Sequence, residues 1–196
     1  DGIKNPGMTW AKGNYEIVND GIIDFSSAEK STAIYVNSAR AKNDGTIKVG
    51  NNASTDSDAV GIYAENTNLT QGNTGTPDIT VGEKGIALYG KNSTITAKGT
   101  VNYSNKGILG YFENSTFTSH YGNLTAHQNT ILFLKNSTAN MNGAGADIDI
   151  TVPDKAATSD SFAGVYVEGT SQLNGVKKIK IGKNSISKYS IKKLKK

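Results

Sequence analysis

The chain has 196 residues, of which 36% are hydrophobic and 19% are charged, and it contains no cysteine. The absence of cysteine excludes a disulfide framework and any cysteine-based metal or redox site. The formal net charge of +4 comes from residues 177–196, which hold nine lysines and no acid, whereas the rest of the chain has 12 basic and 17 acidic residues. A basic end of this kind is weak evidence for nucleic-acid binding, and we expect no nucleic-acid partner.

The chain begins at Asp1 without an initiating Met or a charged and apolar leader. No apolar run reaches the length that spans a membrane. We therefore expect residues 1–196 to be a single segment, mature or excised, of a longer protein.

Repeated units follow one another along the chain. Residues 1–14 are expected to be an N-terminal cover or a preceding rung, and 15–25 a degenerate first copy. An aromatic marker then recurs with a minimum spacing of 22 residues, and longer gaps are insertions. The marker residues are Tyr35, Tyr63, Tyr89, Tyr111, Phe133 and Tyr166.

Each unit contains two runs of strand character. The first run holds the marker and ends at a short polar turn, and a brief apolar hinge, such as Leu69, Ile95 or Phe117, separates it from the second. The second runs are 46–49, 78–81, 100–103, 123–126, 147–152 and 177–181.

Units of this size are too short to bury a core alone and become stable when they stack. The sequence therefore predicts an all-β fold, a right-handed parallel β-helix. This single-stranded solenoid would have about seven rungs and a length on the order of 30 Å. Residues 183–196 are expected to form a lysine-rich cap or the next rung.

Alternation in the first run predicts which side chains point inward. The residues on either side of each marker form the core, as with Leu88 and Gly90, while the markers and the charged residues two positions later face water. The charges alternate in sign between rungs, which favours in-register pairing. This charge column contains Glu65, Lys91, Glu113, Lys135 and Glu168. The next position is expected to form an amide ladder, made of Asn66, Asn92, Asn114 and Asn136.

The insertions are where the rungs differ. Residues 51–59 and 153–162 lengthen the corner after the second run, and 70–77 and 140–146 lengthen the corner before it. Loops on a rigid scaffold often bind partners, and neutral decoration is the alternative interpretation.

Little in the sequence indicates catalysis or a metal. Asp147 and Asp149 share an outward parity and would suit glycoside hydrolysis, but no third partner marks a cleft, so a solvated strand face is favoured. His120 and His127 lack acidic companions, and we expect no metal and no cofactor. Arg40 is the one arginine, which argues against a polysaccharide lyase.

The phrases GIYAENTNLT, ITVGEKGIALYGKNSTITAKGTV and GILGYFENSTFT resemble the passenger regions of large fusobacterial type Va autotransporter adhesins of the RadD kind. The resemblance covers roughly residues 15–181 and rests on scaffold motifs. It implies a β-helix on the bacterial surface, secreted or held in the outer membrane by a C-terminal β-barrel outside this chain. It also implies a role in virulence, through attachment to host cells or to other bacteria.

The expected function is a non-enzymatic adhesin segment whose partner is a host-cell protein or glycan, or another bacterium. The candidate ligand-binding residues are the aromatic markers, Tyr35, Tyr63, Tyr89, Tyr111, Phe133 and Tyr166. Rings that merely pack on one another are the competing interpretation. A carbohydrate-active enzyme on the same fold and a purely structural stalk are the alternative functions.

Overall fold

The computed structural model describes residues 9–11, 16–28, 30–50, 59–72, 77–103, 106–154 and 164–183, the first of these as backbone. The described residues form short strands joined by tight corners, and all strand pairs between them are parallel. This part of the chain has no helix that is long and apolar enough to cross a bilayer.

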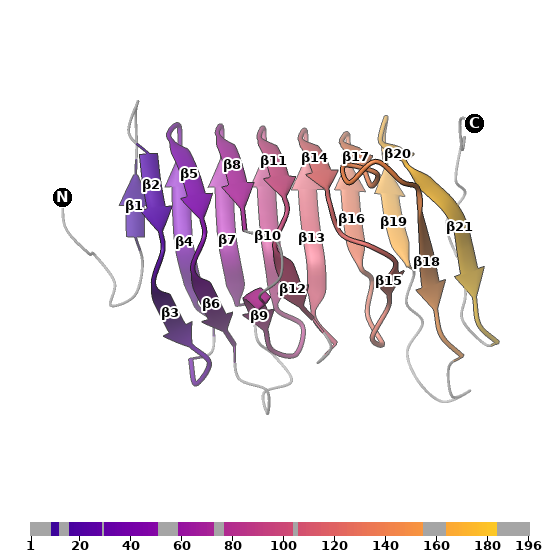
Figure 1. Cartoon of the computed structure of the whole chain (residues 1–196), viewed down its shortest axis with the longest axis horizontal. Coiled ribbons are helices and arrows are strands. Elements are labelled where there is room, and N and C mark those ends of the chain that lie inside the picture. The colour runs from indigo at the N-terminus through magenta and orange to yellow at the C-terminus, as the bar shows by residue number, and fades with distance from the viewer. Residues whose placement is uncertain are drawn as a thin grey trace.

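Three strands make one turn of a solenoid, and each kind of strand stacks into its own sheet (Figure 1). The first sheet contains β1 (Thr9–Ala11), β4 (Thr32–Asn37), β7 (Val60–Glu65), β10 (Ile86–Lys91), β13 (Ile108–Glu113), β16 (Leu132–Lys135) and β19 (Val165–Glu168). The second contains β2 (Glu16–Asn19), β5 (Arg40–Asn43), β8 (Asn68–Gln71), β11 (Thr94–Ala97), β14 (Thr116–Ser119), β17 (Thr138–Asn140) and β20 (Gln172–Asn174).

The third side of the solenoid is divided between two smaller sheets. One contains β3 (Ile22–Phe25), β6 (Thr46–Val49), β9 (Pro77–Val81) and β12 (Thr100–Asn102). The other contains β15 (Leu124–Thr125), β18 (Ile148–Val152) and β21 (Val176–Ile181). In Figure 1 the chain runs up the rear layer and down the front layer as it advances, which is a right-handed coil and confirms the predicted fold class.

The core fills five turns, from β4–β6 to β16–β18. Inward side chains of the terminal turns are less buried. Ile23 and Phe25 at one end and Val165 and Ile179 at the other are half-buried, and Ile181 is 48% exposed. The solenoid thus has five enclosed turns, slightly fewer than the predicted seven rungs, and a less buried turn at each end.

The predicted inward parity of the first sheet is confirmed. Ile62, Leu88 and Leu132 are fully buried, and Leu88 lies in register with Ile62 and Gly110. Phe112 occupies the space beside Gly90, where an added Cβ would lie 2.5 Å from Ile95 Cδ1 and 3.0 Å from Phe112 Cδ1. Large and small residues on adjacent turns thus compensate one another in volume.

Two details of the predicted layout are wrong. The apolar hinge is a full strand, because Leu69, Ile95 and Phe117 are the buried second residues of β8, β11 and β14, which pair in register. In the first turn the marker position belongs to Trp10, which aligns with Tyr35. The predicted first copy, 15–25, starts after this strand, and its Tyr15 lies outside the described residues.

Candidate binding surface

The six aromatic markers form one continuous ladder on the outer face of the first sheet. Their strands are in register, so each ring lies against the ring of the next turn. The centroid distances along the ladder, from Tyr35 through Tyr63, Tyr89, Tyr111 and Phe133 to Tyr166, are 5.2, 4.5, 4.9, 5.8 and 5.5 Å. All six side chains are half-buried.

This geometry limits what the ladder can bind. The stacked rings of Tyr63 and Tyr89 turn their faces toward each other, so that edges and hydroxyl groups are what the column presents outward. Burial raises the pKa of Tyr63 and Tyr89 above the ordinary tyrosine value. The arrangement therefore favours ring packing over sugar stacking on ring faces.

The charge column beside the ladder pairs from turn to turn, as its alternating signs predicted. Lys91 Nζ lies 3.0 Å from Glu65 Oε1, and Lys135 Nζ lies 3.5 Å from Glu113 Oε1 and 4.0 Å from Glu168 Oε1. These ion pairs fix the register of neighbouring turns.

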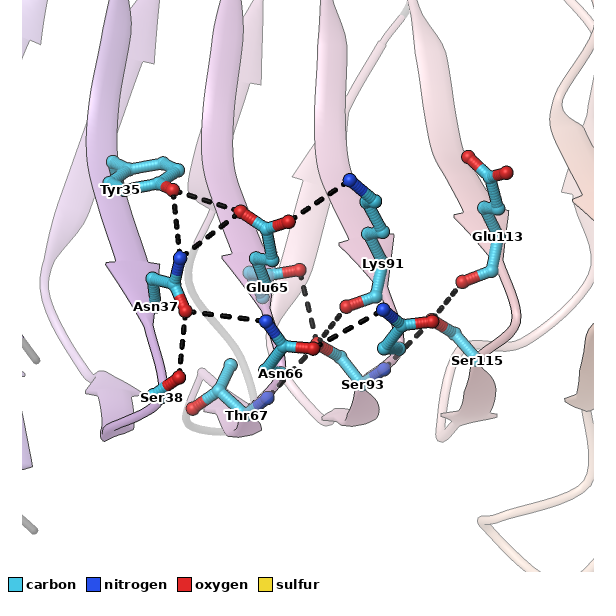
Figure 2. A network of polar contacts seen from close by, with 12 residues as sticks. Tyr35, Asn37, Ser38, Glu65, Asn66, Thr67, Lys91, Ser93, Glu113 and Ser115 are labelled. Carbon is cyan, nitrogen blue, oxygen red and sulfur yellow. Dashed lines mark hydrogen bonds and ion pairs between the residues drawn. The ribbon is translucent and has the colours of Figure 1, made fainter. Parts of the chain in front are cut away.

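Glu65 is the most connected member of the charge column (Figure 2). The Tyr35 hydroxyl donates to its Oε2 at 2.9 Å, and Asn37 Nδ2 donates to the same atom at 3.2 Å. The hydrogen bonds from Lys91 and then Tyr35 hold the pKa of the Glu65 carboxyl below its usual range. The bond to Glu65 likewise raises the pKa of Lys91.

The asparagine positions form the corner between the first and second sheets. Asn66, Asn92, Asn114 and Asn136 all have φ near +50°, a left-handed conformation that Asn tolerates better than most residues. Asn92 Nδ2 donates to Asn66 Oδ1 at 3.2 Å, and Asn66 Nδ2 donates to Asn37 Oδ1 at 3.4 Å. These bonds confirm an amide ladder over those turns.

A buried hydroxyl ladder lies directly inside the asparagine corner. The backbone N–H of each member donates to the hydroxyl oxygen of the next turn, from Thr67 to Ser93 (3.2 Å), Ser93 to Ser115 (3.0 Å) and Ser115 to Ser137 (3.0 Å). Ser93 and Ser115 donate back to the carbonyls of Lys91 and Glu113. This ladder was not predicted, although the recurring Asn-Ser-Thr triplets contain its signal.

An open groove of about 380 Å³ lies over the same corner. It spans three turns, and its lining residues are Ser38, Ala39, Arg40, Asn66, Thr67, Asn68, Asn92 and Thr94. None of these described residues is acidic. The groove could not be predicted from local sequence patterns, because the corner brings together positions from three separate repeats.

The aspartates and the histidine considered for catalysis or metal binding each contact a different neighbouring residue. Asp149 pairs with Lys180 at 3.4 Å, while Asp147 accepts a hydrogen bond from Asn142 at 3.3 Å. The ring of His127 packs edge-on against Tyr103, with centroids 5.5 Å apart. Among the residues that the structure describes, no group of three or more His, Asp or Glu side chains is placed to hold a metal ion.

Most of the predicted insertions fall outside the described residues, since 51–58, 73–76 and 155–163 are not among them. The insertion at 140–146 is described. It leads by turns from β17 towards β18, with the N–H of Gly143 donating to the carbonyl of Ser119 at 2.9 Å.

These features define a parallel β-solenoid with an outer aromatic ladder, inter-turn ion pairs and a polar corner groove. No protein-family model, no curated protein and no solved structure matches the chain.

Proposed function

We propose that the chain is a non-enzymatic segment of a bacterial surface adhesin, the β-solenoid passenger of an autotransporter that attaches the cell to host cells or to other bacteria. The observation that carries the proposal is the contrast between the charge column and the corner groove. The charged residues on the outer face of the first sheet form ion pairs between turns. The polar corner groove is open and offers a contact surface.

A carbohydrate-active enzyme is the less favoured alternative. Paired carboxylates or a basic cluster in one groove would be needed for glycoside hydrolysis or for polysaccharide lysis. Asp149 is tied to Lys180, and the described groove has one cation and no carboxylate. Incubation with host and bacterial polysaccharides, read by new reducing ends or unsaturated products, tests this. Sustained turnover would overturn the adhesin proposal.

Attachment is measured with beads coated by the purified chain, added to epithelial cells and to partner bacteria. Beads coated with an unrelated protein of similar charge are the control, because the lysine-rich end favours non-specific adsorption. Attachment above this control supports the adhesin, and its absence favours a stalk. Deleting 51–59 and 153–162 then tests whether the insertions are the attachment points.

A further inference from the structure

We propose that the corner groove is a binding site for an acidic saccharide, with Arg40 as the anchor for its carboxylate and the neighbouring amides and hydroxyls as partners for its hydroxyl groups. This inference names the ligand class of the proposed adhesin and rests on that function.

Arg40 differs from the paired lysines of the neighbouring turns. Lys42, Lys48, Lys91 and Lys106 each form an ion pair with an aspartate or a glutamate. Arg40 is exposed at the start of β5 and has no ion pair among the described residues, although Glu16 lies in register with it on β2. A guanidinium presents a planar fork of donors that matches a carboxylate, so Arg40 is equipped to bind one from outside the chain.

The floor of the groove contains a second irregularity. Thr67 is 8% exposed, and its Oγ1 has no hydrogen-bond partner among the described residues. Ser93, Ser115 and Ser137 occupy the same column on the following turns, and each donates its hydroxyl to a backbone carbonyl. Figure 2 shows the Thr67 hydroxyl pointing away from Ser93. A buried polar group without a partner requires an explanation, and Thr67 is one of the residues that line this groove.

The remaining lining favours a sugar over a peptide. Asn68 and Thr94 offer amide and hydroxyl groups, and Ala39 is the single apolar residue. Ser38, Asn66 and Asn92 are also polar, and each already forms one or more hydrogen bonds within the corner. These groups recur at the spacing of neighbouring strands, roughly 4.8 Å, which places successive donors and acceptors along the solenoid axis. A saccharide carries alternating donors and acceptors around each ring, whereas a peptide would need apolar pockets for its side chains.

The test uses the full chain and two matched probes, sialyllactose and lactose, which differ by the carboxylate-bearing sugar. Binding is measured by calorimetry and by saturation-transfer NMR. We expect saturable binding of sialyllactose, weaker binding of lactose, and a loss of about tenfold or more in sialyllactose affinity for Arg40→Gln. Lys42→Gln removes the same charge from the next outward position of β5, outside the groove, and should change the affinity less than about twofold.

The inference would be overturned by equal affinity for the two probes, by equal losses in the two variants, or by a failure to bind sialyllactose, lactose and an oligogalacturonate. Binding of oligogalacturonate in place of sialyllactose supports the site and identifies a uronate as the source of the carboxylate. Tighter binding of a glutamate-rich peptide than of either saccharide would also overturn it. Folding of the variants is checked by thermal unfolding, and Arg40→Lys should restore part of the affinity because it keeps the charge.

Failure of this inference is distinguishable from failure of the proposed function. If the wild type binds no saccharide and Arg40→Gln still attaches to cells, the adhesin function stands and the saccharide site in the groove is rejected. If the chain binds saccharide but does not attach to cells, the saccharide site stands and the adhesin function is rejected.

Discussion

Tyr63 and Tyr89 stack with their ring centroids 4.5 Å apart and their planes inclined by 10°, although 26 residues separate them in the sequence. Each interior ring of the ladder contacts a ring on both sides, so the ladder joins successive turns from β4 to β19. Stacked aromatic pairs contribute about 0.5–1.5 kcal/mol each beyond the area that they bury. The ladder is therefore a main source of the stability of the solenoid.

Replacing an interior ring should consequently destabilise the protein. We expect Tyr89→Ala to lower the free energy of unfolding by about 2–3 kcal/mol, since it removes contacts with both Tyr63 and Tyr111. Tyr89→Phe keeps the stacking and should cost less than about 0.5 kcal/mol. Urea unfolding followed by far-UV circular dichroism measures both variants, and equal losses would contradict the stacking argument.

The hydroxyl ladder offers a comparison between a paired and an unpaired hydroxyl. Ser115→Ala leaves the N–H of Ser93 without its acceptor, and we expect a loss of about 1–3 kcal/mol. Thr67→Val removes a buried hydroxyl that has no hydrogen-bond partner among the described residues, and it should stabilise the protein by about 1 kcal/mol.

The Thr67→Val variant also connects stability to binding. If the hydroxyl is retained for a ligand, the more stable variant should bind sialyllactose more weakly than the wild type, as expected where function and stability compete. A gain in stability with unchanged affinity would show that the Thr67 hydroxyl plays no part in binding.

The sequence predicted those features that follow from local alternation. Alternation along a strand, combined with the repeat, predicts the inward position of Leu88, the aromatic ladder and the Glu65–Lys91 pair. The register is well specified, because a shift by one residue would turn every side chain to the opposite face. The strand of the second sheet in each turn, such as β11, was not predicted, because it has at most four residues and directly follows the left-handed corner. The groove was missed because Arg40, Thr67 and Thr94 come together only when three turns are stacked.

The corner asparagines should be sensitive to the shape of the backbone. Asn114 has a φ of +50°, which costs a residue with an ordinary Cβ about 1 kcal/mol. We expect Asn114→Ala to lower the unfolding free energy by about that amount, whereas Asn114→Gly should be close to neutral because glycine adopts positive φ readily. Thermal unfolding of the two variants decides this, and a larger loss for Gly than for Ala would refute it.

The carboxylate next to Arg40 should weaken the binding of external carboxylates. Glu16 aligns with Arg40 across β2 and β5, one strand away on the side opposite Asn68. Removing its charge in Glu16→Gln should raise the affinity for sialyllactose by about two- to threefold at low salt, with a smaller gain at high salt. Lactose binding should not change, and a gain for both sugars would indicate an effect that is independent of charge.

The Glu65–Lys91 pair predicts a specific dependence of stability on pH. The folded-state pKa of Glu65 lies below its unfolded value, because of Lys91 first and Tyr35 second. Its contribution is therefore present above the ordinary glutamate pKa of about 4.3 and is lost as the pH falls through the folded-state value. The folded-state pKa of Lys91 is raised, so its contribution is present below about 10.4 and is lost as the pH rises further.

Lys91→Met should therefore lower the urea midpoint of unfolding near neutral pH. As the pH decreases below about 4.3, the midpoint should fall less steeply in this variant than in the wild type. Lys48→Met is the matched control. It also removes a lysine from an ion pair, but the pKa of its partner Asp24 is lowered mainly by Ser26, so the acid limb should keep its slope. The Glu65 side-chain carboxyl, followed by NMR, should titrate closer to the ordinary value in Lys91→Met than in the wild type. Profiles that remain parallel for the wild type and Lys91→Met would show that the pair carries no linkage between folding and protonation.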